Sequence, residues 1–207
     1  MGYFVMRKKY ILLTFSSVLI ILLMSILQLM RAHTPQQPYR VLGKKGIVEF
    51  RFYPAALMAS VSSEDTTYKG SSNKNFRQLA GYIFGRNQRN ESIAMTAPVH
   101  MEMQDTQSIM RFVLPSGYTV ANVPKPQSEA VSIQQSPEEY VAVIRFGGWA
   151  SDKKIQEHTE ELEQLLTGMG IHHLGNFRFL GYNAPWDFLF RRNEVIVGIS
   201  KEAIPDF

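Results

Sequence analysis

The chain alternates between two kinds of hydrophobic periodicity. Ile47–Tyr53 is apolar at every second position, which predicts a half-buried strand. Ser71–Phe84, and a segment that follows the N-cap residue Ser151, place apolar side chains three or four positions apart, which predicts two amphipathic helices. Further strands are predicted at Ala55–Val61, near Ser92–Met103, and at Ser108–Leu114, Tyr140–Phe146, Phe177–Tyr182 and Glu194–Ser200.

The order of these elements repeats. A strand, a helix and two strands occur twice, and the two helices are of similar length. This indicates an internal duplication at the level of pattern rather than of residue identity. Each half would lay one amphipathic helix on an antiparallel sheet, so the expected fold class is α+β.

The N-terminal segment has a different character. Ile11–Met30 is 20 residues long and contains no charge, and a helix of this length spans about 30 Å, the thickness of a bilayer core. No small-residue cleavage pattern follows it, which favours an uncleaved anchor over a signal peptide. We therefore expect a transmembrane helix, or signal-anchor, within residues 1–31, with residues 10–31 against lipid. A linker at 32–38 and a globular domain at 39–207 would follow.

The distribution of charge gives this segment an orientation. Arg7, Lys8 and Lys9 precede the apolar stretch, which places the N-terminus in the cytoplasm and the domain on the periplasmic or extracytoplasmic side. A secreted or periplasmic domain released by cleavage is the alternative. With these three residues and Arg31 removed, 18 basic residues face 18 acidic ones, so the rest of the chain lacks the basic surface of a nucleic-acid-binding protein.

Composition removes several kinds of chemistry. The chain has no cysteine, which excludes disulfides, thiolate catalysis, cysteine zinc sites and covalent haem attachment. It also carries no G-x-S-x-G, H-E-x-x-H or phosphate-loop motif, so no strong catalytic signature is present. We expect a protein that is not an enzyme.

A series of short segments resembles the SOUL/haem-binding protein family, in the order in which that family shows them. The most diagnostic is IAMTAPV at Ile93–Val99, and together the segments cover roughly residues 38–200. The others are EFRFYP at Glu49–Pro54, FRQLAGYIFGRN at Phe76–Asn87, FVLP at Phe112–Pro115, VAVIRFG at Val141–Gly147, YNAPW at Tyr182–Trp186 and RRNEV at Arg191–Val195.

This resemblance implies a fold and a ligand. The fold would be a distorted antiparallel β-barrel of two similar halves, each with one helix, in agreement with the duplication. The ligand would be haem or a related tetrapyrrole, bound non-covalently by a monomer that acts as a carrier, scavenger or buffer at the membrane. No histidine lies between His33 and His100, so the opening strand cannot supply an axial histidine.

A haem site needs an apolar slot, an axial ligand and cations for the propionates. The candidate ligand-binding residues are Arg51, Tyr53, Met95, His100, His158, Tyr182, Trp186 and Arg192. Each of these residues could instead have a purely structural role. His158, for example, lies along the apolar face of the second helix, where a histidine is usually a hydrogen-bonded residue at the boundary of the core. Met95, with Met101 and Met103, could bind Cu(I), but methionines also fill gaps in cores.

Two other functions stay open. Glu49 with Tyr53, or Glu194 with Tyr182, could form an acid–base pair in a small-molecule hydrolase on a fold similar to the GyrI-like effector-binding domains. The domain could also be a membrane-anchored interaction module. A large aromatic-lined cavity would favour tetrapyrrole binding, a buried Glu/Tyr pair at the floor of that cavity would favour the hydrolase, and a filled interior would favour the interaction module.

Overall fold

A computed structural model describes residues 14–19, 21–22, 25, 34–183, 187 and 190–207. The chain divides into two units, Met1–Thr34 and Pro35–Phe207. Residues 14–19 of the first unit are helical, and most of the predicted anchor lies outside the described residues. Within the described part of the chain, no helix reaches the length and apolar character that a membrane span requires.

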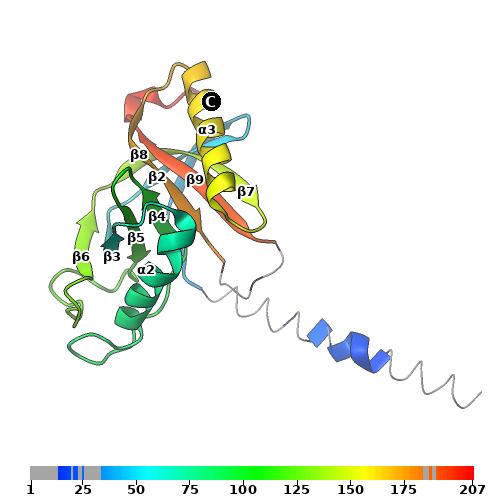
Figure 1. Ribbon diagram of the computed structural model, residues 1–207. Helices are drawn as coiled ribbons and strands as arrows, with labels where there is room; N and C mark the ends of the chain where they lie inside the picture. Colours follow the sequence, from blue (N-terminus) through cyan, green and yellow to red (C-terminus); the bar gives the residue numbers. More distant parts are fainter. Residues whose placement is uncertain (1–13, 20, 23–24, 26–33, 184–186, 188–189) are drawn as a thin grey trace, which may run out of the picture. The chain divides into compact units, whose positions relative to one another are not determined.

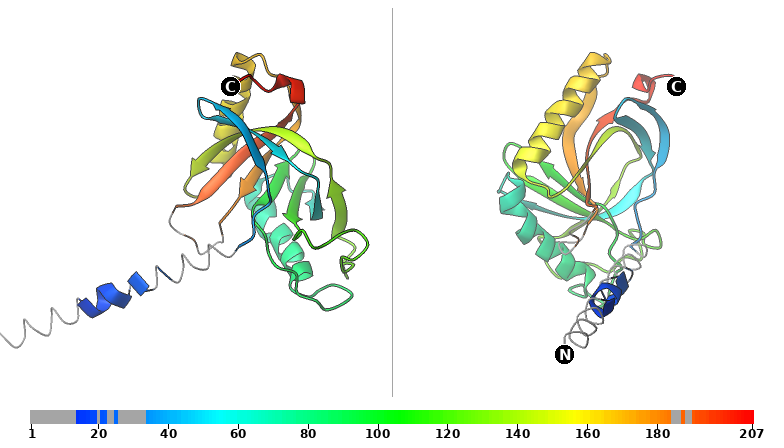
Figure 2. Two further views of the ribbon diagram at one scale, coloured as in Figure 1. Left: turned by 180° about the vertical axis from the view of Figure 1, so that it is seen from behind. Right: turned by 90° about the vertical axis from the view of Figure 1, so that its right-hand side faces the viewer.

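The second unit is built on one antiparallel sheet of nine strands, in the order β1-β2-β7-β9-β8-β4-β5-β3-β6 (Figure 1). The sheet curls around as a half-barrel whose edges are β1 and β6 (Figure 2). The strands are β1 Arg40–Lys45, β2 Val48–Tyr53, β3 Ala56–Ser63, β4 Val99–Met103, β5 Ser108–Val113, β6 Ser132–Ser136, β7 Glu139–Gly147, β8 His173–Gly181 and β9 Arg192–Ile199.

The predicted duplication is visible in the strand order, which reads symmetrically about the β8–β4 pair. β3, α2, β4 and β5 of the first half correspond to β7, α3, β8 and β9 of the second. The strand that precedes each set pairs with the other half: β2 pairs with β7, and β6 pairs with β3. The two halves have therefore exchanged their first strands.

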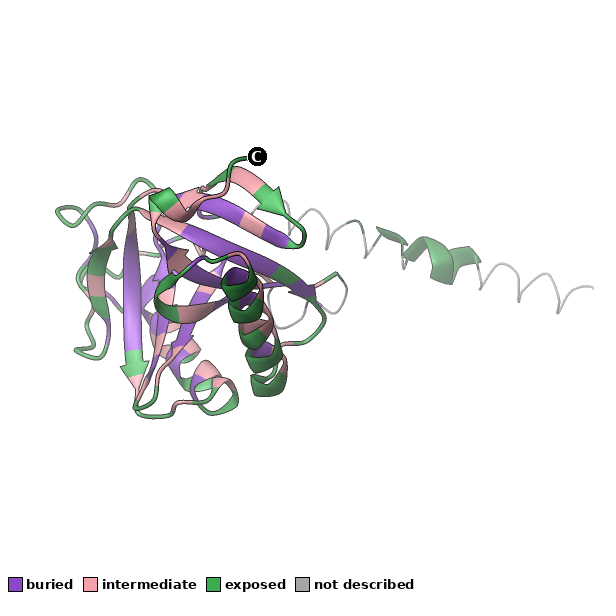
Figure 3. Ribbon diagram, turned by 90° about the horizontal axis from the view of Figure 1, so that it is seen from above, coloured by how far each residue is buried: buried purple, intermediate pink, exposed green. Residues whose placement is uncertain are grey.

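Both helices pack on the same face of the sheet and enclose the main hydrophobic core. α2 is Tyr68–Ile83 and α3 is Asp152–Gly168, and Ser151 caps α3 by accepting a hydrogen bond from the Lys154 N–H, as predicted. Leu79, Leu162 and Leu166 are at most 1% exposed. Figure 3 shows buried strands beneath helices whose outer sides are exposed.

Two features of the sheet differ from the sequence expectation. The sheet is a curled half-barrel and not a closed barrel, because β1 and β6 pair with other strands and not with each other. β1 and β6 were also not expected. Their sequences, RVLGKK and SIQQS, are mostly polar and exposed edge segments without clean alternation, so periodicity does not reveal them.

The opposite face of the sheet carries polar side chains and is partly covered by the chain that leads into β1. The Gln37 N–H donates to the Ala97 carbonyl at 2.8 Å, and the Ala97 N–H donates to the Pro35 carbonyl at 2.9 Å. Gln37 is 4% exposed. Part of the stretch predicted as a linker is thus packed against the domain.

Candidate functional site

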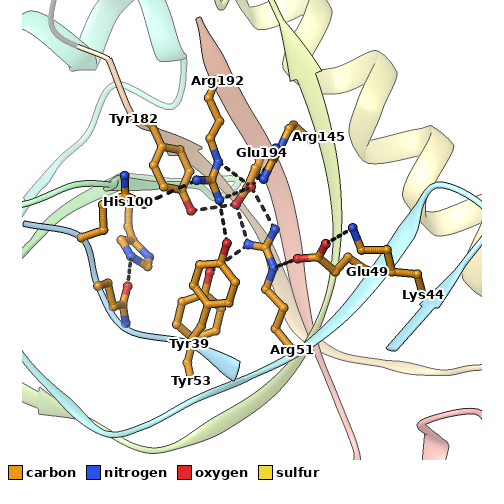
Figure 4. Close-up of polar contacts among 12 residues, drawn as sticks. Tyr39, Lys44, Glu49, Arg51, Tyr53, His100, Arg145, Tyr182, Arg192 and Glu194 are labelled. Atoms are coloured by element: carbon orange, nitrogen blue, oxygen red, sulfur yellow. Dashed lines mark hydrogen bonds and ion pairs between the residues drawn. The ribbon is translucent and has the colours of Figure 1, made fainter. Parts of the chain in front are cut away.

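Among the polar side chains that the structure describes, the carboxylate of Glu194 on β9 stands out by the number of its hydrogen bonds and ion pairs. Its side chain is fully buried. Arg51 on β2 donates to both oxygens, from Nη1 to Oε2 at 2.8 Å and from Nη2 to Oε1 at 3.0 Å. Arg192 donates to Oε1 from Nη2 at 2.8 Å, and the Tyr182 hydroxyl donates to Oε2 at 2.8 Å (Figure 4). Nε of Arg145 on β7 lies 3.4 Å from Oε1 of Glu194.

Arg51 links this carboxylate to the neighbouring groups. It donates from Nε to Glu49, which also pairs with Lys44, and from Nη1 to the Tyr53 hydroxyl at 3.1 Å. Its guanidinium lies over the ring of Tyr39, 4.2 Å from the centroid (Figure 4). The side chain is 1% exposed. Arg51 thus donates four hydrogen bonds to groups of the protein itself, and two of its partners, Glu49 and Glu194, are carboxylates of the sheet.

The sequence supplies these positions through strand alternation. On β2, Glu49, Arg51 and Tyr53 point away from the helices, while Val48 and Phe50 enter the core, as the period of two predicts. β7 separates β2 from β9 and presents the small or apolar residues Val141 and Val143 on this face. The long Arg51 side chain can therefore reach Glu194 across β7.

The environment sets the protonation state of the network. Burial alone would raise the pKa of Glu194, but the hydrogen bonds and charge of Arg51, with the charge of Arg192, outweigh burial and hold the pKa below its usual range. Burial and the adjacent Glu194 charge raise the pKa of Tyr182 far above its usual range. Burial likewise raises the pKa of Tyr53.

This arrangement answers the acid–base hypothesis. Glu194 and Tyr182 do meet, as a hydrolase of the expected kind would need. A general acid or base works best when its pKa lies near the working pH. Here the carboxylate stays ionised and the phenol stays protonated at neutral pH, so the Glu194–Tyr182 hydrogen bond is suited to joining β9 to the residue after β8 rather than to proton transfer.

His100 on β4 forms a second polar site on the same face of the sheet. Its Nε2 lies 2.8 Å from Oε1 of Gln37, and its Nδ1 is buried without a hydrogen-bond partner. Burial, aided by the charges of Arg178 and Arg111, lowers the pKa of His100 well below its usual value. The ring is thus neutral, with the proton on Nε2 facing the amide oxygen and a lone pair on Nδ1.

The structure divides the predicted ligand-binding residues into groups. Arg51, Tyr53, Tyr182 and Arg192 converge on Glu194, and His100 lies on the same face of the sheet. Met95 and His158 lie on the helix-covered side. Met95 packs against the main core, where Met101 is buried and Met103 also packs. His158 stacks on Phe146 with ring centroids 4.2 Å apart and contacts Glu161 at 2.8 Å. Trp186 lies outside the described residues.

Sequence reasoning missed three members of this face. Tyr39 and Gln37 lie in or beside the stretch predicted as a linker, and Arg145 occupies an outward position of β7. The alternation within YVAVIRF at Tyr140–Phe146 could have placed Arg145 on the polar face. No local pattern indicates that Gln37 and Tyr39 pack on the sheet.

A groove of about 370 Å³ lies elsewhere on the domain, between the turn after α2, the 120–126 connection and β6. Its apolar lining consists of Val120, Ala121, Val123, Pro126 and Ile133. Arg89 and Lys125 add two exposed cations to its lining, and Gln88 completes it. Apolar contact with cations at the margin suits a flat anionic ligand, but this lining includes no histidine, tyrosine or methionine to act as an axial ligand.

Comparison with known proteins decides the family. The family model described as SOUL heme-binding protein matches residues 34–198. The chain belongs to the SOUL family. Heme-binding protein 2 of Mus musculus and of Homo sapiens are each 30% identical to it over 158 residues, which is 72% of this chain and 77% of the relative. Heme-binding protein 1 of Xenopus tropicalis is 26% identical, over 74% of this chain and 85% of the relative.

Solved structures extend the likeness of the SOUL domain at the level of fold. The C-terminal domain of EcmrR aligns with a TM-score of 0.59 at 11% identity, over 79% of this chain and 98% of that one. The crystal structure of a hydrolase from Listeria innocua aligns with a TM-score of 0.54 at 10% identity, over 77% of this chain and 94% of that one. At such identities the likeness concerns the fold alone.

Proposed function

We propose that the SOUL domain binds haem or a related tetrapyrrole non-covalently, and that it does so as a binding protein rather than an enzyme. The observation that carries this proposal is the family match over residues 34–198, together with relatives named heme-binding proteins 1 and 2. The ionised Glu194 and protonated Tyr182 support a binding role, because neither titrates near neutral pH.

The groove beside β6 is the proposed place of contact. Val120, Val123 and Ile133 would pack against one edge of the macrocycle, while Arg89 and Lys125 would face its carboxylates. Because the groove's lining offers no axial ligand, affinity would come from the ring and the carboxylates rather than from iron. Metal-free protoporphyrin IX should then bind about as well as haem.

The test is a titration of the full chain in phosphatidylcholine nanodiscs, with empty nanodiscs subtracted to remove ligand dissolved in lipid. Haem is followed by Soret absorbance and protoporphyrin IX by fluorescence. We expect saturable one-to-one binding of both. Arg89→Ala and Lys125→Ala should each weaken the affinity for both ligands about threefold, which is the effect expected when one exposed ion pair is lost. Lys45 is an exposed cation on β1 outside the groove, and Lys45→Ala should leave the affinity unchanged.

Two results would count against this proposal. Absence of saturable binding would remove tetrapyrrole binding. Saturation by haem alone, abolished in His100→Ala, would move the site from the groove to the buried imidazole. In the first case the second candidate, a membrane-anchored interaction module, takes its place. It is favoured by the way the protein's own side chains occupy the sheet face around Glu194.

We also propose that Ile11–Met30 tethers the domain to a bilayer, with the domain on the periplasmic or extracytoplasmic side, where it would act as a carrier, scavenger or buffer. The uncharged stretch of 20 residues and the basic residues before it support this. Resistance of the full chain to extraction from membranes by alkaline carbonate tests the tether. Release of the protein into the carbonate supernatant would contradict the tether. Protease access to the domain in sealed vesicles of known orientation tests on which side of the membrane the domain lies.

A further inference from the structure

We infer that one end of the SOUL domain, carrying Trp149 and Phe190, lies in the interfacial region of the bilayer. This inference rests on the proposed tether. This end is formed by Gln36, Trp149, Phe190 and Arg191. Its proposed partner is a phospholipid headgroup layer, and it supplies two exposed aromatic side chains to that layer.

Chain connectivity brings this end close to the membrane. Pro35 follows Met30 by five residues, and at 3.8 Å per step these Cα atoms lie at most about 19 Å apart. Pro35 is itself fixed to the domain, because its carbonyl accepts a hydrogen bond from the Ala97 N–H at 2.9 Å. The part of the domain beside Pro35 is therefore the part that a short tether keeps nearest the lipid.

The exposed aromatic residues lie at this same end. Oε1 of Gln36, the residue after Pro35, is 3.4 Å from Nη1 of Arg192, and Phe190 precedes Arg192 by two residues. Gly147 at the end of β7 pairs with Arg192, and Trp149 follows Gly147 by two residues. The Arg191 guanidinium lies over the Trp149 ring, 4.2 Å from the centroid, which joins the two segments.

The exposure and backbone of Phe190 support a partner outside the domain. Its side chain is 86% exposed, and Trp149 is 52% exposed. Phe190 also has a φ of 53°, in the left-handed region that a bulky residue seldom adopts. The other described non-glycine residue with positive φ is Asn90, a type that tolerates this region. The domain holds Phe190 in an unfavourable conformation without burying it, and an interfacial lipid layer would cover it.

The chemistry of these side chains fits the headgroup region. Aromatic rings, tryptophan above all, concentrate at membrane–water interfaces, where an apolar body and a polar edge are both satisfied. Arg191 supports Trp149 from within the domain, since its Nη1 donates to the Asp187 carbonyl at 2.7 Å while its guanidinium lies over the Trp149 ring. Single exposed apolar residues are common on protein surfaces, but two aromatics and an arginine at the end next to a tether form a coherent surface.

The absence of cysteine allows single labels to test the inference in the full chain. Phe190→Cys carries an NBD fluorophore in phosphatidylcholine nanodiscs that contain increasing amounts of lipid with a doxyl quencher at acyl position 5. Leu174→Cys is the matched control, since Leu174 is 57% exposed on the same β8–β9 hairpin but at its opposite end. Ile21→Cys, within the apolar segment, reports on the tether.

We expect a blue shift and a progressive loss of emission at position 190, and neither at position 174. Equal quenching at both positions, or none at 190 while position 21 is quenched, would overturn the inference and leave the tether standing. A blue shift at 190 without quenching would place protein rather than lipid over Phe190, which also overturns it. No quenching at position 21 would remove the tether itself. Tetrapyrrole binding is measured separately and does not depend on either outcome.

Discussion

Arg51→Met tests whether the network around Glu194 holds the sheet together. The substitution keeps a long apolar stem but removes both charge-assisted hydrogen bonds to Glu194, a carboxylate that is fully buried. Loss of one partner of a buried ion pair costs about 3–5 kcal/mol. Arg192 and Tyr182 remain bonded to Glu194, so we expect the lower end, about 3 kcal/mol. For a domain of this size, that lowers Tm by about 9 °C.

The assay is thermal unfolding of the full chain in mild detergent, followed by circular dichroism. Arg145→Met is the matched control, because Arg145 approaches the same carboxylate at 3.4 Å from a side chain that is 56% exposed, and we expect less than about 1 kcal/mol there. In a double-mutant cycle, Arg51→Met with Glu194→Gln should be less damaging than the two single changes combined. Equal effects of the two arginine variants, or strict additivity in the cycle, would refute the reasoning.

Three further predictions concern pH and helix capping. Because the folded-state pKa of His100 lies well below the ordinary 6.5, its contribution to stability is present above pH 6.5 and falls by up to about 1.4 kcal/mol per pH unit below it. The urea midpoints measured at pH 7.5 and pH 5.5 should therefore differ less in His100→Gln than in the unchanged protein. An equal difference in the two proteins would contradict this. Because the folded-state pKa of Glu194 lies below the ordinary 4.5, its contribution to stability is present above pH 4.5 and is lost as the pH falls through the lower folded value. Glu194→Gln should therefore flatten the acid limb of a plot of Tm against pH. An acid limb parallel to that of the unchanged protein would argue against this. Ser151→Ala removes the N-cap of α3 and should lower the free energy of unfolding by about 1 kcal/mol in urea titration, whereas Ser151→Thr should retain most of it.

Much of the fold follows from local pattern. The period of two in β2 places Glu49, Arg51 and Tyr53 on one face, and Ser151 marks the start of α3, all without long-range information. β1 escapes this reasoning because an edge strand is solvent-exposed and needs no apolar face. Family resemblance adds the expectation of a barrel-like curl of the sheet, which periodicity alone does not specify, and the structure shows that this curl stops at a half-barrel.

The candidate site is less accessible to sequence reasoning, because its members come together through strand pairing. Arg51 and Glu194 are 143 residues apart in the sequence, and they meet only because β2 and β9 both pair with β7 and lie on either side of it. Alternation predicts that each faces away from the helices, but not that they share a neighbourhood. Gln37 is harder still, since a polar residue in a short segment before β1 shows no pattern that indicates its contact with His100.

The exchange of first strands between the halves has a consequence for how the chain reaches its native state. Neither half can complete its own sheet: β3 needs β6 from the second half, and β7 needs β2 from the first, with Phe50 opposite Ala142. These pairings close long loops before any local contact compensates for the lost chain entropy, which is the situation that slows folding. The repeated halves should therefore behave as one cooperative unit, and a chain interrupted between β5 and β6 should yield fragments that fold only when mixed.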